Sequence, residues 1–197
     1  MHFPAFSPDG LKLAAANREG GVTIWDANSG QELLALAGDS PVFSAVTFSA
    51  DGTQLLAGGQ EGIIHAWDAQ SGERLRDFRS DQDTIIELLL TANDEILSGF
   101  DQEGVSVLWD MATGARLRRT QCQNFGHNLK LIDAEVSEDG RLTAVACNDA
   151  YVVQPQDRLD TDTILHTLAK GLGAATGVAF NPEGTILATS TDEGAVT

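Results

Sequence analysis

The 197-residue sequence has few basic residues, few cysteines and no long apolar run. Its 12 Lys and Arg residues stand against 29 Asp and Glu, a net charge of −17. Nucleic acids and anionic membranes are bound through dense positive charge, so the charge balance argues against both as main partners. Two cysteines, Cys122 and Cys147, cannot form a disulfide framework, and neither belongs to a CxxC motif.

No apolar run approaches the roughly 18 residues of a membrane span, and residues 1–10 lack the basic and apolar regions of a signal peptide. At the same time 42% of the residues are hydrophobic, which excludes a disordered acidic tail. These features together predict a cytoplasmic protein with a buried core.

A turn that ends in Asp-Gly or a related pair recurs along the whole chain. The last residues of these turns are Gly10, Gly52, Asp94, Gly140 and Gly184, spaced by 42, 42, 46 and 44 residues. An apolar residue precedes each of them by four positions, and an acidic residue follows each by nine. The sequence is therefore a tandem array whose units are approximately 1–36, 37–78, 79–120, 121–168 and 169–197.

Each complete unit predicts four short strands joined by tight turns. Segments such as residues 42–48 and 176–180 are rich in Val, Phe and Thr and end at a turn. No long helical period is present. The predicted fold class is all-β, built of four-stranded antiparallel sheets.

Three of the units carry a Trp-Asp pair fifteen residues after the turn position, at Trp25 with Asp26, Trp67 with Asp68, and Trp109 with Asp110. Together with the Phe-Ser-Pro-Asp-Gly turn, these pairs resemble the WD-repeat β-propellers. The resemblance implies a ring of four-stranded blades around a channel. These six residues, together with His127, are the expected structural residues of the repeat.

The sequence departs from this family in a set of polar residues that normally bond to one another within a blade. Gly-His occurs once, at Gly126 and His127, and His127 belongs to a unit with Pro155 at its Trp position. The second-strand hydroxyl is replaced by Ala15, Ala57, Gly99 and Val145, and only Thr189 matches. Blade cohesion should therefore depend on apolar burial.

About four and a half units are present, whereas closed rings need four to eight blades. We expect an arc of a larger ring, with an irregular small ring or a complementing oligomer as alternatives. An isolated arc would expose apolar blade faces and a strand edge, which predicts self-association through the unfinished ends.

No catalytic, cofactor or metal constellation is evident, and none is predicted. The glycine-rich residues 170–177 lead into a strand, whereas a dinucleotide site needs a helix there. The paired acids at 81–83 and 160–162 lack the glycine and distal glutamate of a calcium loop. The four His residues show no metal-ligand spacing.

The predicted function is a non-catalytic interaction scaffold that binds proteins or peptides through loops on one propeller face. The alternatives are a hydrolase-like propeller enzyme and the scaffold or sensor part of a larger kinase or ATPase fusion. The acidic balance favours partners with a neutral or basic contact surface. The candidate partner-binding residues are Arg18, Gln60, Arg79, Phe100, Gln102 and Phe125. For Phe100 and Phe125 inward packing is an equal alternative, and Arg74 and Arg76 are expected on one solvated strand face.

Overall fold

The computed structural model describes residues 4–17, 20–38, 42–80, 84–91, 93–101, 105–121, 133–137, 142–146, 150–155, 162–168, 174–181 and 183–194. Every regular element in these ranges is a β-strand, which confirms the all-β class. The strands are β1 (Ala5–Phe6), β2 (Lys12–Ala16), β3 (Gly21–Asp26), β4 (Glu32–Ala37), β5 (Phe43–Phe48), β6 (Gln54–Gly59), β7 (Ile63–Asp68), β8 (Arg74–Arg79), β9 (Glu87–Leu90), β10 (Ile96–Phe100), β11 (Val105–Asp110), β12 (Arg116–Gln121), β13 (Asp133–Val136), β14 (Thr143–Ala146), β15 (Ala150–Pro155), β16 (Asp162–Leu168), β17 (Ala175–Phe180) and β18 (Leu187–Thr191).

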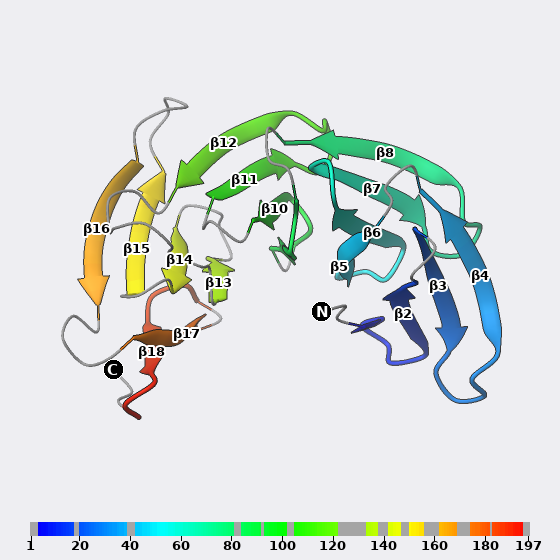
Figure 1. The fold of residues 1–197 in the computed structure, drawn as a ribbon, viewed down its shortest axis with the longest axis horizontal. Helices are drawn as coiled ribbons and strands as arrows, with labels where there is room; N and C mark the ends of the chain where they lie inside the picture. The colour runs from blue at the N-terminus through cyan, green and yellow to red at the C-terminus, as the bar shows by residue number, and fades with distance from the viewer. Residues whose placement is uncertain are drawn as a thin grey trace. The chain divides into compact units, whose positions relative to one another are not determined.

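These strands form four four-stranded sheets and one two-stranded sheet, each with its strands side by side in chain order (Figure 1). We number the sheets along the chain: the first is β1–β4, the second β5–β8, the third β9–β12, the fourth β13–β16 and the fifth β17–β18. Neighbouring strands in the first and second sheets pair antiparallel throughout. The described strands thus give the predicted four and a half sheets.

The chain divides into two compact units. The first contains Met1–Asp101 and Trp109–Ala115, and the second contains Gln102–Leu108 and Arg116–Thr197. No helix among the described residues is long and apolar enough to cross a membrane.

The recurring Asp-Gly turn has one geometry in several sheets. The backbone N–H of Gly10 donates to Ser7 O at 2.8 Å, and that of Gly52 donates to Ser49 O at 2.9 Å. Both glycines have a positive φ, near +70°, which glycine adopts without strain. Asp94 holds this position in the third sheet with φ 57°, a conformation that Asp tolerates better than most residues.

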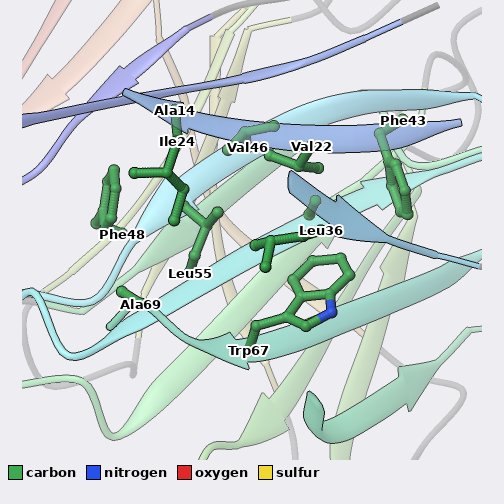
Figure 2. Packing of buried hydrophobic residues seen from close by; sticks show 11 residues of the cluster. Ala14, Val22, Ile24, Leu36, Phe43, Val46, Phe48, Leu55, Trp67 and Ala69 are labelled. Atoms are coloured by element: carbon green, nitrogen blue, oxygen red, sulfur yellow. The ribbon is translucent and has the colours of Figure 1, made fainter. Parts of the chain in front are cut away.

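The core of the first unit lies between the first two sheets (Figure 2). Ala14, Val22 and Ile24 of the first sheet are fully buried in the same cluster as Leu55 and Trp67 of the second. These positions alternate along their strands because successive side chains point to opposite faces. This packing agrees with the prediction that apolar burial holds the blades together.

Three side chains also join neighbouring sheets of the first unit through backbone groups. Lys12 Nζ donates to Ala69 O at 2.9 Å, and Arg76 Nη1 donates to Met111 O at 2.9 Å. The carboxylate of Asp94 accepts from the backbone N–H of Ala50 at 2.8 Å. Each bond runs from the turn or strand of one sheet to a turn beside the next.

In the second unit, β13 and β14 pack against β17. The contact uses small residues, with Ala144 and Ala146 buried against Ala175 and Val178. The carboxylate of Asp133 accepts from the backbone N–H of Val178 at 3.0 Å. The carboxylate of Glu135 accepts likewise from the N–H of Phe180.

Candidate interaction surface

The Asp of each Trp-Asp pair caps the turn that follows it. Asp68 Oδ1 accepts from the backbone N–H of Gln70 at 3.0 Å and of Ser71 at 2.7 Å, and from Ser71 Oγ at 2.9 Å. Asp26 and Asp110 cap the corresponding turns in the same way. These hydrogen bonds lower the pKa of all three carboxyl groups below its ordinary value. These acids therefore act as turn residues in the described sheets.

The Trp residues of the second and third sheets pack against apolar and aromatic side chains. Trp67 and Trp109 are 2% and 1% exposed, whereas Trp25 is only partly buried. Phe78 of the second sheet meets Trp109 edge to face, with ring centroids 6.1 Å apart. Gly99 leaves room for this ring, because a Cβ atom there would lie 3.1 Å from Trp109 Cζ3.

An aromatic group replaces the missing polar set around Trp67. Phe43 and His65 both contact Trp67 edge to face, with ring centroids 5.9 Å and 5.5 Å away. Ala57, at the second-strand position, is fully buried and offers no hydroxyl. In this sheet, aromatic packing around Trp67 therefore takes the place of the hydrogen-bonded polar set of the family.

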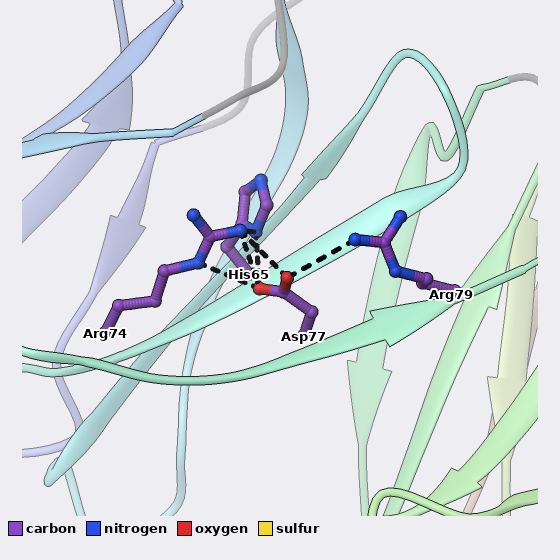
Figure 3. A network of polar contacts seen from close by, with 4 residues as sticks. All are labelled: His65, Arg74, Asp77 and Arg79. Atoms are coloured by element: carbon purple, nitrogen blue, oxygen red, sulfur yellow. Dashed lines mark hydrogen bonds and ion pairs between the residues drawn. The ribbon is translucent and has the colours of Figure 1, made fainter.

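His65 connects this aromatic group to a polar network on β8 (Figure 3). Asp77 lies opposite His65 in the strand pairing, and its Oδ1 is 2.8 Å from His65 Nδ1. Arg74 donates through Nε and Nη2 to the two oxygens of Asp77, both at 2.9 Å. Arg79 approaches the same carboxylate from the other side, with Nη2 3.7 Å from Oδ2.

Two opposing effects set the ionisation of Asp77. Partial burial acts to raise its pKa, while hydrogen bonds from His65 and Arg74 and their charges act to lower it. The hydrogen bonds and charges prevail, so the pKa of Asp77 lies below its ordinary value.

The His65 side chain is completely buried, and its two ring nitrogens differ in their surroundings. Nδ1 lies within hydrogen-bond distance of both Asp77, which accepts, and Arg74 Nη2 at 2.6 Å, which donates. One nitrogen can serve only one of them at a time. Nε2 is buried with no hydrogen-bond partner among the described residues.

The structure brings two of the predicted binding residues to one end of the second sheet. Gln60 follows β6, and residues 60–62 turn into β7. Arg79 ends β8 opposite Ile63, and the N–H of Ser80 donates to Gly62 O at 2.9 Å. We call residues 60–62 with Arg79 and Ser80 the loop end of the second sheet.

Other predicted residues have different places. Phe100 is fully buried, which is the inward-packing alternative kept open by the sequence. Arg18, Gln102, Phe125 and His127 lie outside the described residues.

The predicted placement of Arg74 and Arg76 on one solvated face is wrong. Arg74 turns to Asp77, whereas Arg76 reaches Met111 O in the third sheet. The cause is a register shift between Ala66 and Trp67, which interrupts the simple alternation of side chains on β8. Sequence reasoning missed His65 and Asp77 as a pair. Their alignment across β7 and β8 depends on this register.

Among the described residues no group of three or more His, Cys, Asp or Glu side chains could hold a metal ion. The polar network of the second sheet contains two Arg, one Asp and one His, and offers donors and a single carboxylate. Its chemistry suits hydrogen bonding to a partner at the exposed Arg79, whose side chain is 68% exposed.

Comparison with known proteins bears on the fold. Residues 30–68 match the family model described as WD domain, G-beta repeat. The comparison with curated proteins gave no match. Among 1637 solved chains that match, one from "Crystal Structure of Mitotic Checkpoint Complex" has a TM-score of 0.73 and 16% identity. The match covers 98% of this chain and 62% of that chain, so the present chain spans less than two thirds of its length.

These matches confirm the resemblance to the WD-repeat β-propellers and the propeller fold of four-stranded blades. The identity to the solved chain is too low to carry more than the fold. The match to the WD-repeat family model over residues 30–68 supports an interaction scaffold in general terms.

Proposed function

We propose that this chain is a non-catalytic scaffold that binds a protein segment or peptide at the loop end of the second sheet. The observation that carries the proposal is the exposure of the Arg79 side chain and the weakness of its contact with Asp77. Within the part of the chain that the structure describes, its guanidinium makes one long contact, 3.7 Å to Asp77, and its side chain is 68% exposed. Arg is a frequent anchor in protein interfaces because its planar group donates several hydrogen bonds.

The sheet beneath Arg79 is rigid enough to position such an anchor. β6 and β7 are almost entirely buried, and β8 pairs with β7 along its length. Arg79 would donate to carbonyl oxygens of a bound segment, with the exposed Gln60 adding a further polar contact. Binding groups placed on loops and strand ends of a rigid scaffold lose little entropy on binding.

The charge of the whole chain selects the partner. At −17 it repels acidic proteins and attracts basic ones at low salt, so we propose a neutral or basic contact surface on the partner. On the same ground we propose neither nucleic acid nor membrane as partner. A cytoplasmic location is proposed from the low cysteine content.

The test is selection from a random peptide display library on the immobilised chain, with an unrelated β-protein as reference. We expect enriched peptides to be neutral or basic. Arg79→Ala should weaken their binding at least tenfold, or about 1.4 kcal/mol.

Two further variants form a matched control. Gln60→Glu and Gln70→Glu place the same exposed change at opposite ends of the second sheet. Only Gln60→Glu should alter the affinity, and added salt should weaken binding of basic peptides. Peptides that bind Arg79→Ala as well as the unmodified chain would contradict the proposal, as would a failure to enrich any peptide over the reference.

A further inference from the structure

The outer strand of the first sheet has one backbone edge that faces away from the sheet. The strands follow the order β1–β2–β3–β4, so β4 pairs with β3 on its inner side (Figure 1). Among the described residues no strand pairs with its outer side. The backbone groups of such an edge can hydrogen-bond to a further strand.

The pairing with β3 decides which backbone groups of β4 point outward. The N–H of Asp26 donates at 2.8 Å to the carbonyl oxygen of the residue that precedes β4. In an antiparallel pair the hydrogen-bonded residues alternate along each strand, so Thr23 and Gly21 fall between the bonded residues of β3. They lie opposite Ala35 and Ala37. The N–H and C=O groups of these two alanines therefore face away from the sheet.

The side chains at these outward positions are small in β4 and charged in β8. Ala35 and Ala37 are both exposed. One repeat of 42 residues later, Asp77 and Arg79 take their places, with the same pairing to the preceding strand. Charged side chains on an edge strand hinder its pairing with another chain. The edge of β8 is protected in this way, and the edge of β4 is not.

The two faces of β4 differ next to this edge. Leu33 is the extra residue at the register shift in β4 and is 44% exposed. Leu36 is buried, and a Cβ atom at Gly72 of the second sheet would lie 3.0 Å from its Cδ2. An added strand would therefore find an apolar side chain to contact at Leu33.

The surroundings of the edge are acidic. Glu32 begins β4, Glu73 follows Gly72, and both are exposed. The sequence has no Lys or Arg between Arg18 and Arg74. Charge complementarity therefore favours a basic strand on this edge. A second copy of the chain would bring the same acids to the edge and be repelled.

We propose that the outer edge of β4 binds an extended, basic segment of a partner protein as a fifth strand of the first sheet. The segment hydrogen-bonds through its main chain to Ala35 and Ala37 and places an apolar side chain against Leu33. Its basic side chains approach Glu32 and Glu73. Main-chain hydrogen bonds supply affinity in this mode of recognition, and the side chains supply specificity. The site is separate from the loop end of the second sheet.

The probe is the synthetic peptide Lys-Val-Thr-Val-Thr-Val-Lys, whose Val and Thr residues favour a strand. Both Thr residues are N-methylated, so that one edge of the peptide cannot pair and the peptide does not associate with itself. A control peptide is N-methylated at the Val residues as well, which blocks both edges without changing charge or side chains. Fluorescence anisotropy at low salt measures the binding of each peptide to the 197-residue chain. We expect the control peptide to bind at least tenfold more weakly, because it has lost the N–H donors that face β4.

Hydrogen exchange followed by NMR locates the binding edge. The outward N–H groups of Ala35 and Ala37 should exchange at least tenfold more slowly when the probe is saturating, because the added strand accepts from them. The N–H of Asp77, at the equivalent outward position of β8, should be unaffected.

Two substitutions of equal charge distinguish the edge from general electrostatics. Ala35→Lys places a charge at the centre of the edge and should weaken binding of the probe at least tenfold. Leu75→Lys, at a 48% exposed residue of β8, is the control and should change the affinity less than about twofold.

Four results would overturn the proposal. They are equal binding of the two peptides, unchanged exchange at Ala35 and Ala37, an equal loss of binding in Leu75→Lys, and a loss in Arg79→Ala alone. The last result would place the probe at the loop end of the second sheet. Self-association of the chain without peptide, abolished by Ala35→Lys, would assign the edge to a second copy instead.

Discussion

His65 Nδ1 and Asp77 Oδ1 lie 2.8 Å apart and connect a fully buried side chain to the outermost strand of its sheet. Asp77 is the shared acceptor of the network, since His65, Arg74 and Arg79 all approach its carboxylate. Removal of this carboxylate would take away the acceptor that His65 and Arg74 hold within hydrogen-bond distance, and the longer contact of Arg79 with it.

Asp77→Ala should therefore lower the free energy of unfolding by about 1–2 kcal/mol, a value reduced for the partial exposure of the pair. Urea unfolding followed by circular dichroism measures it. Arg79→Ala is the control in the same network. Its 3.7 Å contact is exposed, so the change should stay within about 0.5 kcal/mol. Equal losses in both variants would mean that the network does not act through Asp77.

Acid should destabilise the protein through its turn-capping aspartates. The pKa of Asp26, Asp68 and Asp110 is lowered in the folded state by hydrogen bonds that the unfolded chain lacks. The unfolded state then binds more protons, so the stabilisation is present above the unfolded pKa near 3.9 and is lost as the pH falls through the lower folded values.

Thermal unfolding between pH 6 and pH 2.5 tests this expectation. High salt is needed to screen the general repulsion of a −17 chain, which protonation relieves. We expect the melting temperature to fall below about pH 4, with a smaller fall in the double variant Asp68→Asn, Asp110→Asn. A melting temperature that stays level down to pH 2.5 would contradict the assignment.

The turn between β6 and β7 holds Glu61 in an unfavourable backbone conformation. Its φ is 70° and that of Gly62 is 63°, and two-residue turns of this kind prefer Asn-Gly. Glu61→Asn should raise the free energy of unfolding by about 0.5–1 kcal/mol, because Asn tolerates positive φ better than Glu. Gly62→Ala should have the opposite effect on the same urea curve. No gain in the Asn variant would show that the turn carries no such strain.

Restoring the family's hydroxyl on the second strand of the third sheet should lower the stability of the protein. A Cβ atom at Gly99 would lie 3.1 Å from Trp109 Cζ3 and 3.2 Å from Ile64 Cδ1. Gly99→Thr should therefore destabilise the protein by about 1–3 kcal/mol through overpacking. Ala15→Ser adds only the hydroxyl oxygen, at the equivalent, partly exposed position of the first sheet, where we expect no measurable change. A stable Gly99→Thr variant would mean that Trp109 can move.

The sequence predicts the sheets and turns well because their signals are local. Asp68 caps its turn through contacts with Gln70 and Ser71, both within three residues, so spacing alone reveals the role. The environment of Trp67 could not be predicted in this way. His65 and Phe43 contact it from two different strands. Ala57 in the sequence shows that the hydroxyl is missing, but it does not show which side chains pack around Trp67.

Strand pairing and the neighbouring sheet, which the sequence does not specify directly, decide where several candidate-site residues lie. Phe100 and Arg79 both end strands, but only the pairing and the neighbouring sheet decide that one is buried and the other exposed. Arg74 and Arg76 point in opposite directions because of one register shift in the pairing of β7 with β8. No residue type in this segment predicts that shift from the sequence.

The bonds from Lys12 to Ala69 O, from Arg76 to Met111 O and from Asp94 to Ala50 N all end on the main chain of the neighbouring sheet. Main-chain groups persist whatever side chain a position carries. Substitutions at Ala69, Met111 or Ala50, which contribute only main-chain groups, therefore leave these bonds intact. The sequence of one repeat can change at these positions without loss of the bond to its neighbour. That independence gives the repeats freedom to diverge from the WD pattern while the spacing between blades is kept.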